Sequence, residues 1–177
     1  MQEKKMNALI IMVTGGQRSG KSVFAEHLAL QLSDHPTYLA TARVMDKEME
    51  DRVAVHKERR KDVWRNIEAP LYTDVISFKE KEVVLIDCLT LWATNWFFEE
   101  NEDASKAVSS VKRQIESLLM KDATFIIVTN EVGLGGVSSN NMQRKFADMQ
   151  GEINQYVASI AEEVYLIVSG IPVKIKG

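Results

Sequence analysis

The sequence predicts an α/β fold of the P-loop NTPase type, a three-layer sandwich with a mostly parallel central sheet. Two observations predict it: a complete phosphate loop follows the first apolar run, and short apolar runs alternate with helical stretches along the 177 residues. Runs that are apolar at nearly every position suit strands covered by helices on both faces. Because no repeat or Pro/Gly-rich linker interrupts the pattern, residues 1–177 are expected to form a single nucleotide-binding catalytic domain.

The expected strands and helices follow one another in alternation. The strands are mostly apolar runs at 8–13, 37–40, 83–86, 124–129 and 163–168. The helices are stretches with apolar residues every three or four positions, at about 21–32, 46–61, 88–98, 103–120 and 140–161. This spacing is clearest in the stripe of Val108, Val111, Ile115, Leu118 and Leu119.

Composition places the chain among ordinary enzymes. It is 45% hydrophobic and 27% charged, and its net charge of −3 gives no electrostatic reason to expect a nucleic-acid partner. The apolar run 8–13 is too short to span a membrane, which takes about 20 residues. A single cysteine, Cys88, has no partner for an internal disulfide, so the cytoplasm is the expected location.

The phosphate loop is the strongest functional signal. It consists of Gly15, Gly16, Gln17, Arg18, Ser19, Gly20, Lys21 and Ser22, in the pattern G-x-x-x-x-G-K-S. Glycines let consecutive backbone N–H groups turn toward phosphate oxygens, and the following helix points its positive N-terminus at the same anion. Lys21 is expected near the β- and γ-phosphates, and the Ser22 hydroxyl is expected on Mg²⁺. The chain is therefore predicted to bind a nucleoside triphosphate.

Polar residues follow two of the other expected strands. Asp87 directly follows the run 83–86. It is our candidate for a second magnesium ligand, because ligand sites collect at the carboxyl ends of parallel strands. The alternative is an aspartate that caps the helix beginning near Cys88. Asn130 and Glu131 follow the run 124–129 in the same way, although such a pair is also common in turns and caps.

A histidine lies on the apolar side of the expected helix 46–61. His56 continues the stripe of Met49 and Val53, and the cations Lys57, Arg59 and Arg60 follow it. A neutral imidazole can accept a phosphoryl or nucleotidyl group, and such cations can clamp a polyphosphate beside it. The local pattern by itself favours the other interpretation, a core histidine that hydrogen-bonds a backbone carbonyl.

Several segments together resemble a known family. They are 13–22, 38–42, 52–60, 64–68, 87–92, 129–133, 144–155 and 168–174. In this combination the chain resembles, from end to end, the bifunctional adenosylcobinamide kinase and adenosylcobinamide-phosphate guanylyltransferase of cobalamin biosynthesis. The loop form Gly-Gly-x-Arg-Ser-Gly-Lys-Ser, with Asn-Glu-Val-Gly at 130–133, is more specific than a bare phosphate loop.

The resemblance implies two reactions on one fold. The family phosphorylates adenosylcobinamide with ATP or GTP, and then transfers GMP from GTP to adenosylcobinamide phosphate, which gives adenosylcobinamide-GDP and pyrophosphate. His56 matches the family's guanylylated histidine. The resemblance also implies a homotrimer.

The same resemblance implies a set of nucleotide contacts. Besides the phosphate loop they are Ala40, Thr41, Ala42, Lys57, Glu58, Arg59, Arg60, Glu68 and Asp87. Two departures from the family pattern are the segment 137–143, which lacks a Pro-Glu-Asn-like start, and Arg43. The first departure bears on substrate affinity and assembly.

Two other functions fit part of the pattern. A small-molecule kinase that uses ATP alone needs the phosphate loop and Asp87 but gives His56 no chemical task. A non-enzymatic nucleotide switch needs a loop that senses the γ-phosphate, and no such loop is recognisable in the sequence.

Overall fold

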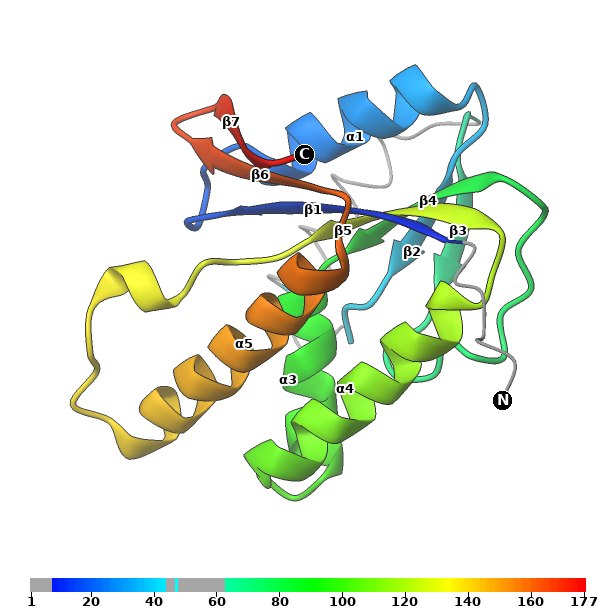
Figure 1. The fold of residues 1–177 in the computed structure, drawn as a ribbon. Coiled ribbons are helices and arrows are strands. Elements are labelled where there is room, and N and C mark those ends of the chain that lie inside the picture. The colour runs from blue at the N-terminus through cyan, green and yellow to red at the C-terminus, as the bar shows by residue number, and fades with distance from the viewer. Residues whose placement is uncertain (1–7, 44–46, 48–62) are drawn as a thin grey trace.

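The computed structural model describes residues 8–43, 47 and 63–177. In this part of the chain one mixed sheet runs through the centre of the molecule (Figure 1). Most of the expected helix 46–61, with His56 and the cations after it, lies outside the described residues.

Among the described residues the sheet has seven strands, in the order β3-β2-β4-β5-β1-β6-β7. Their bounds are β1 (Leu9–Gly15), β2 (Thr37–Ala40), β3 (Arg65–Glu68), β4 (Glu82–Asp87), β5 (Ala123–Val128), β6 (Glu163–Val168) and β7 (Ile171–Lys176). All neighbours are parallel except β6 and β7, which are antiparallel. The predicted mostly parallel sheet is therefore confirmed.

Helices cover both faces of the sheet. The elements are α1 (Lys21–Leu32), α3 (Leu89–Glu99), α4 (Ala104–Leu119), α5 (Asn141–Ile160) and the short 3₁₀ helix η2 (Gly133–Gly135). Figure 1 shows α1 on one face and α3, α4 and α5 on the other, which makes the expected three layers. Within the described ranges no helix is long and apolar enough to cross a membrane.

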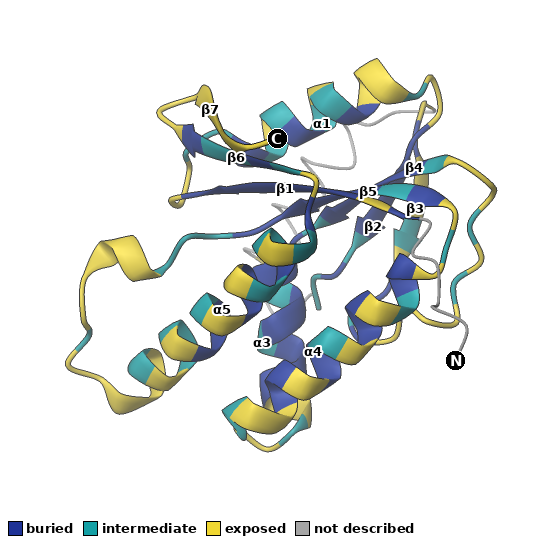
Figure 2. Cartoon of the chain, in the orientation of Figure 1, coloured by how far each residue is buried: buried dark blue, intermediate teal, exposed yellow. Residues whose placement is uncertain are grey.

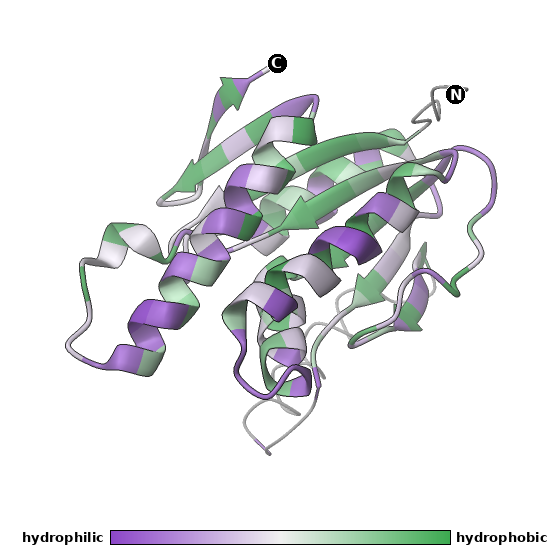
Figure 3. Cartoon of the chain, turned by 60° about the horizontal axis from the view of Figure 1, so that its bottom comes forward, coloured by the Kyte–Doolittle hydropathy of each residue, from purple (hydrophilic) through white to green (hydrophobic). Residues whose placement is uncertain are grey.

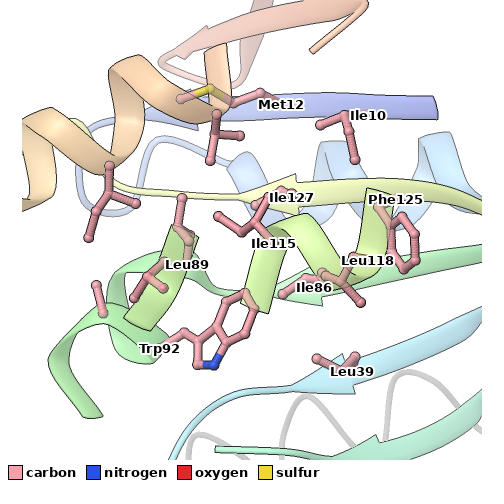
Figure 4. Close-up of a cluster of buried hydrophobic side chains, with 14 of the residues drawn as sticks. Ile10, Met12, Leu39, Ile86, Leu89, Trp92, Ile115, Leu118, Phe125 and Ile127 are labelled. Atoms are coloured by element: carbon pink, nitrogen blue, oxygen red, sulfur yellow. The ribbon is translucent and has the colours of Figure 1, made fainter. Parts of the chain in front are cut away.

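The hydrophobic core lies on both faces of the central strands (Figure 2). Alternate residues of one strand enter opposite clusters: Ile10 and Met12 face α3 to α5, whereas Ile11 and Val13 face α1. Figure 4 shows the larger cluster, in which Trp92 and Leu118 pack beside strand residues such as Ile127. The strands are largely hydrophobic and the outward sides of the helices largely hydrophilic (Figure 3). Burial on both faces explains why the central strands could be predicted from apolar runs in the sequence.

Two strands were missing from the sequence prediction. Strand β3 reads Arg-Asn-Ile-Glu and is mostly exposed at the edge of the sheet, so it carries almost no apolar signal. Strand β7 is exposed along its whole length and contains Pro172, which an edge strand tolerates. The other predicted elements in the described part form with ends shifted by no more than two residues.

Candidate active site

The phosphate loop lies between β1 and α1. Strand β1 ends at Gly15 and helix α1 begins at Lys21, as the strand–loop–helix pattern predicts. The residue before the helix is Gly20, with φ of 98°, and no side chain caps the first turn. The first backbone N–H groups of α1 are therefore not engaged by a capping side chain, which is what an anion-binding helix terminus requires.

Two glycines of the loop occupy positions where a side chain would be strained. Gly15 has φ of +153°, and a Cβ on it would lie 2.5 Å from the carbonyl oxygen of Ile167 and 2.8 Å from Ser19 Oγ. Gly20 has φ of +98°, and its Cβ would lie 3.2 Å from the Cα of Gly170. Both glycines are needed because the β6 strand and the turn after it press closely on the loop.

The turn between β6 and β7 supports the loop from the side. Its two residues, Ser169 and Gly170, both have positive φ, which matches the tight turns that join antiparallel strands. The Gly170 N–H donates to the Ser19 carbonyl oxygen at 2.8 Å. The C-terminal hairpin thus holds the loop in place.

Lys21 is buried, and its ammonium group donates to the carbonyl oxygen of Gly16 at 2.6 Å. Burial lowers the pKa of Lys21 below its ordinary value, while the nearby Cys88 and Asp87 oppose the shift. Burial also raises the pKa of the Cys88 thiol to about 12, with Asp87 adding to the effect. At neutral pH the thiol is uncharged and adds no negative charge beside Lys21.

Asp87 is the last residue of β4. Its Oδ2 accepts a hydrogen bond from the Tyr38 hydroxyl at 2.9 Å. The following helix α3 begins at Leu89 with Cys88 in the N-cap position, so the alternative in which Asp87 caps this helix is wrong. The carboxylate lies instead at the carboxyl end of β4, close to the lysine of the phosphate loop.

The register of the strands brings three of the expected nucleotide-binding residues into one row across the sheet. Ala40 ends β2 and pairs with Glu68 of β3 on one side and with Asp87 of β4 on the other. The next residue, Thr41, is buried. Its N–H donates a hydrogen bond to the Asp87 carbonyl oxygen, and its hydroxyl donates one to the Cys88 carbonyl oxygen at 2.8 Å. Ala42 is half-buried and Glu68 is exposed. The structure thus brings Ala40, Glu68 and Asp87 side by side, and their contact with a nucleotide stays a prediction.

A buried polar network holds the segment after β5. Thr129 Oγ1 donates to Asn154 Oδ1 at 2.8 Å and accepts from Gln150 Nε2 at 3.1 Å. Asn154 Nδ2 donates to the Asn130 carbonyl at 3.0 Å, and the Glu131 N–H donates to the Gly15 carbonyl at 3.0 Å. Helix α5 thus holds Asn130, and Gly15 holds Glu131, next to the phosphate loop.

This network was not predicted from the sequence. Thr129, Gln150 and Thr90 were not candidates, although Thr90 Oγ1 accepts from the Asn130 N–H at 2.9 Å. The available signal was a pair of amide side chains, at 150 and 154, on the otherwise apolar face of an amphipathic helix. Such residues need buried partners, and Thr129 supplies one.

The remaining candidates differ in what the structure describes. Ser22 is half-buried, and Gln17 and Arg18 are exposed on the loop. His56, Lys57, Glu58, Arg59 and Arg60 lie outside the described residues, so their predicted roles remain predictions.

Residues 11–175 match the family described as cobinamide kinase / cobinamide phosphate guanyltransferase. The chain belongs to this family. It is 37% identical over 182 residues to the bifunctional adenosylcobalamin biosynthesis protein CobU of Escherichia coli K12, with 95% of this chain and all of that protein covered. It is equally similar, over 169 residues, to the bifunctional adenosylcobalamin biosynthesis protein CobP of Pseudomonas aeruginosa, with 94% of this chain and 96% of that protein covered.

Membership of the cobinamide kinase / cobinamide phosphate guanyltransferase family confirms the resemblance predicted from sequence and makes this protein an enzyme. Among solved structures, a Pyrococcus horikoshii OT3 protein is similar in fold, with a TM-score of 0.54 at 10% identity. The similarity covers 96% of this chain and 86% of that one. At this identity it supports the α/β fold and nothing about activity.

Replacing Gly15 with alanine tests the close packing under the phosphate loop. We expect Gly15→Ala to lower the free energy of unfolding by about 1–3 kcal/mol, because the added Cβ meets the Ile167 carbonyl and the backbone conformation is strained. Urea unfolding measures this loss of stability.

The neighbouring glycine provides the matched control. A Cβ on Gly16 would meet nothing within 4 Å, so Gly16→Ala should change stability by no more than about 0.5 kcal/mol. Equal losses in both variants would contradict the packing argument.

Proposed function

We propose that this chain carries out both reactions of its family on adenosylcobinamide. It phosphorylates the hydroxyl of adenosylcobinamide with ATP or GTP, and then transfers GMP from GTP to the new phosphate through a guanylyl intermediate on His56. The products of the second reaction are adenosylcobinamide-GDP and pyrophosphate. The observation that carries the proposal is the phosphate loop with buried Lys21 beside Asp87, in a chain that belongs to the family over residues 11–175.

The phosphate loop supplies charge and backbone donors for the first reaction. The acceptor hydroxyl attacks the γ-phosphorus, the bond to the β-phosphate oxygen breaks, and a nucleoside diphosphate and the hydroxyl proton are released. Residues Gly15 to Ser22 hold the phosphates during this step. Lys21 suits the stabilisation of the transferring phosphoryl group because its ammonium already lies at the loop, where it donates a hydrogen bond to the Gly16 carbonyl oxygen at 2.6 Å. Its positive charge offsets the negative charge of that group.

Mg²⁺ fits the residues at this edge of the sheet. Its proposed ligands are the Ser22 hydroxyl and the Asp87 carboxylate. The described residues contain no group of three or more His, Cys, Asp or Glu side chains arranged for a metal, and Mg²⁺ commonly uses one or two carboxylates with phosphate oxygens and water. When bound, the ion neutralises charge on the phosphates. Tyr38 would orient the Asp87 carboxylate toward it through the hydrogen bond at 2.9 Å.

The second reaction proceeds in two displacements. A neutral His56 nitrogen attacks the α-phosphorus of GTP, forming a nitrogen–phosphorus bond and releasing pyrophosphate. An oxygen of adenosylcobinamide phosphate then attacks the same phosphorus, and His56 leaves. Two inversions give net retention at the phosphorus. Lys57, Arg59 and Arg60 would offset negative charge on the phosphates, while Ala40, Thr41, Ala42, Glu58 and Glu68 complete the proposed nucleotide contacts.

We also propose that the chain assembles as a homotrimer and acts in the cytoplasm. Support for an assembly comes from strand β7, an edge strand whose apolar residues Ile171, Val173 and Ile175 are 66%, 46% and 60% exposed. A row of exposed apolar side chains next to unpaired backbone groups is typical of a surface that another chain covers.

The guanylyl intermediate is tested with GTP labelled at the α-phosphate. Wild-type protein should retain acid-labile label without any corrinoid, and His56→Ala should lose the label and reduce guanylyl transfer by about 10³-fold or more. Phosphorylation of adenosylcobinamide should stay measurable, because it needs no histidine nucleophile.

His35→Ala serves as the matched control, because His35 is exposed in the loop before β2. It should label like the wild type. A His56→Ala protein that still acquires GMP would remove His56 as the nucleophile. Equal loss of both activities with a lower melting temperature would favour the core-histidine interpretation.

The role of Asp87 is tested through the metal requirement. We expect Asp87→Asn to raise the Mg²⁺ concentration for half-maximal kinase activity by at least about tenfold, because the amide keeps the size but removes the charge that binds the ion. Asp122→Asn, at an exposed turn before β5, should leave the requirement unchanged. An unchanged requirement in Asp87→Asn would exclude Asp87 as a ligand.

The assembly is tested by light scattering. The mass of the wild type should be about three times that of the 20.0 kDa chain. Val173→Asp should lower it, because the introduced charge would have to be buried at the contact. Val75→Asp, at a position that is 79% exposed and away from β7, should leave the mass unchanged. A wild-type mass of one chain would contradict the proposal.

A further inference from the structure

A cavity of about 960 Å³ opens between the end of α3, the start of α5 and the segment that joins β5 to α5. Its lining includes Phe97 and Phe98 of α3, Val132 and Val137 of the joining segment, and Met142 and Phe146 of α5. Small-molecule sites usually measure roughly 300–1,000 Å³ and are mostly apolar. This cavity therefore suits a ligand at the upper end of that size range.

The apolar walls of the cavity are exposed. Val137 is 90% exposed, Phe98 52% and Met142 47%. Polar groups share the lining, with side-chain amides from Asn141 and Gln143 and charged side chains from Arg144, Lys145 and Asp148. The surface thus combines apolar area with a few hydrogen-bonding groups, as sites for large amphipathic molecules do.

Hydrogen bonds hold the wall of the cavity in place. The Arg144 guanidinium donates to the carbonyl oxygens of Ser138 and Ser139 at 2.9 and 2.8 Å. The Asn140 side chain caps α5 by accepting from the Gln143 N–H at 3.2 Å. A wall that is already ordered loses less entropy when a ligand binds.

The cavity adjoins the phosphate loop through the segment after β5. Glu131 donates its N–H to the Gly15 carbonyl, and the next residue, Val132, already lines the cavity. Consecutive Cα atoms are about 3.8 Å apart, so the cavity wall begins within one residue of the loop contact.

Sheet topology also favours ligand binding between the phosphate loop and the segment after β5. The adjacent strands β1 and β5 lead into helices on opposite faces of the sheet, α1 on one side and α5 on the other (Figure 1). In open parallel sheets, ligands bind where the connections of neighbouring strands diverge in this way. The phosphate loop and the segment after β5 lie on the two sides of this divergence.

We propose that this cavity binds the corrinoid of the acceptor substrate, with the hydroxyl arm directed toward the phosphate loop. The proposal rests on the proposed function, in which adenosylcobinamide is the acceptor. A corrin macrocycle is large, carries methyl groups on its faces and bears amide side chains at its rim, which matches the size, the apolar walls and the amide lining. The acceptor must also lie next to the phosphates, since attack needs about 3–3.5 Å between the reacting atoms.

The experiment separates corrinoid binding from nucleotide chemistry. Val137→Asp and Met142→Asp each introduce a carboxylate at an exposed position of the wall, and Val75→Asp makes the same kind of change on an exposed surface elsewhere. We expect the KM for adenosylcobinamide to rise at least about tenfold in the two cavity variants, because their carboxylates must lose water against an apolar ligand. Val75→Asp should keep the wild-type KM.

Labelling by α-labelled GTP without corrinoid provides the second readout. It should stay at the wild-type level in both cavity variants, which also shows that they fold. A wild-type KM for adenosylcobinamide in both variants would overturn the proposal. A lower mass by light scattering at unchanged KM would do the same and would identify a second copy of the chain as the occupant. Absence of any activity of the wild type on adenosylcobinamide would instead contradict the proposed function.

Discussion

The close approach of three backbone segments at Gly15 is the constraint on which the site depends. Its carbonyl accepts from Glu131 after β5, while a side chain at its Cα would collide with the Ile167 carbonyl of β6. One residue without a side chain therefore joins the phosphate loop to the segment after β5 and to the C-terminal hairpin. Because neighbouring strands determine this approach, the buried sheet sets the shape of the loop, and the loop residues alone do not.

Much of the site was predictable because parallel strands end together. Asp87 and Asn130 each follow an apolar run in the sequence, and the structure places both at the edge that carries the phosphate loop. The glycine positions were predictable for a similar reason, since the motif encodes the turn that phosphates require. These features depend on residues close together in the chain, where spacing carries the information.

The features that sequence reasoning missed depend on contacts between distant residues. The Tyr38–Asp87 hydrogen bond joins residues that become neighbours only when β2 pairs with β4. The bond between Thr129 and Gln150 requires α5 to cross the sheet at one particular place. Strands β3 and β7 lie at the edges, where exposure removes the apolar pattern that identified the central strands. No local pattern carries this information because it arises from packing.

The environment of Cys88 disfavours the thiolate form of its side chain. Oxidants, alkylating reagents and disulfide exchange all act on the thiolate, and a thiol with a pKa of about 12 forms very little of it at physiological pH. The buried sulfur contributes packing next to Lys21 and Asp87, and its backbone carbonyl accepts the hydrogen bond from Thr41. At neutral pH the sulfur beside the phosphate loop therefore acts as a packing atom and is a poor nucleophile.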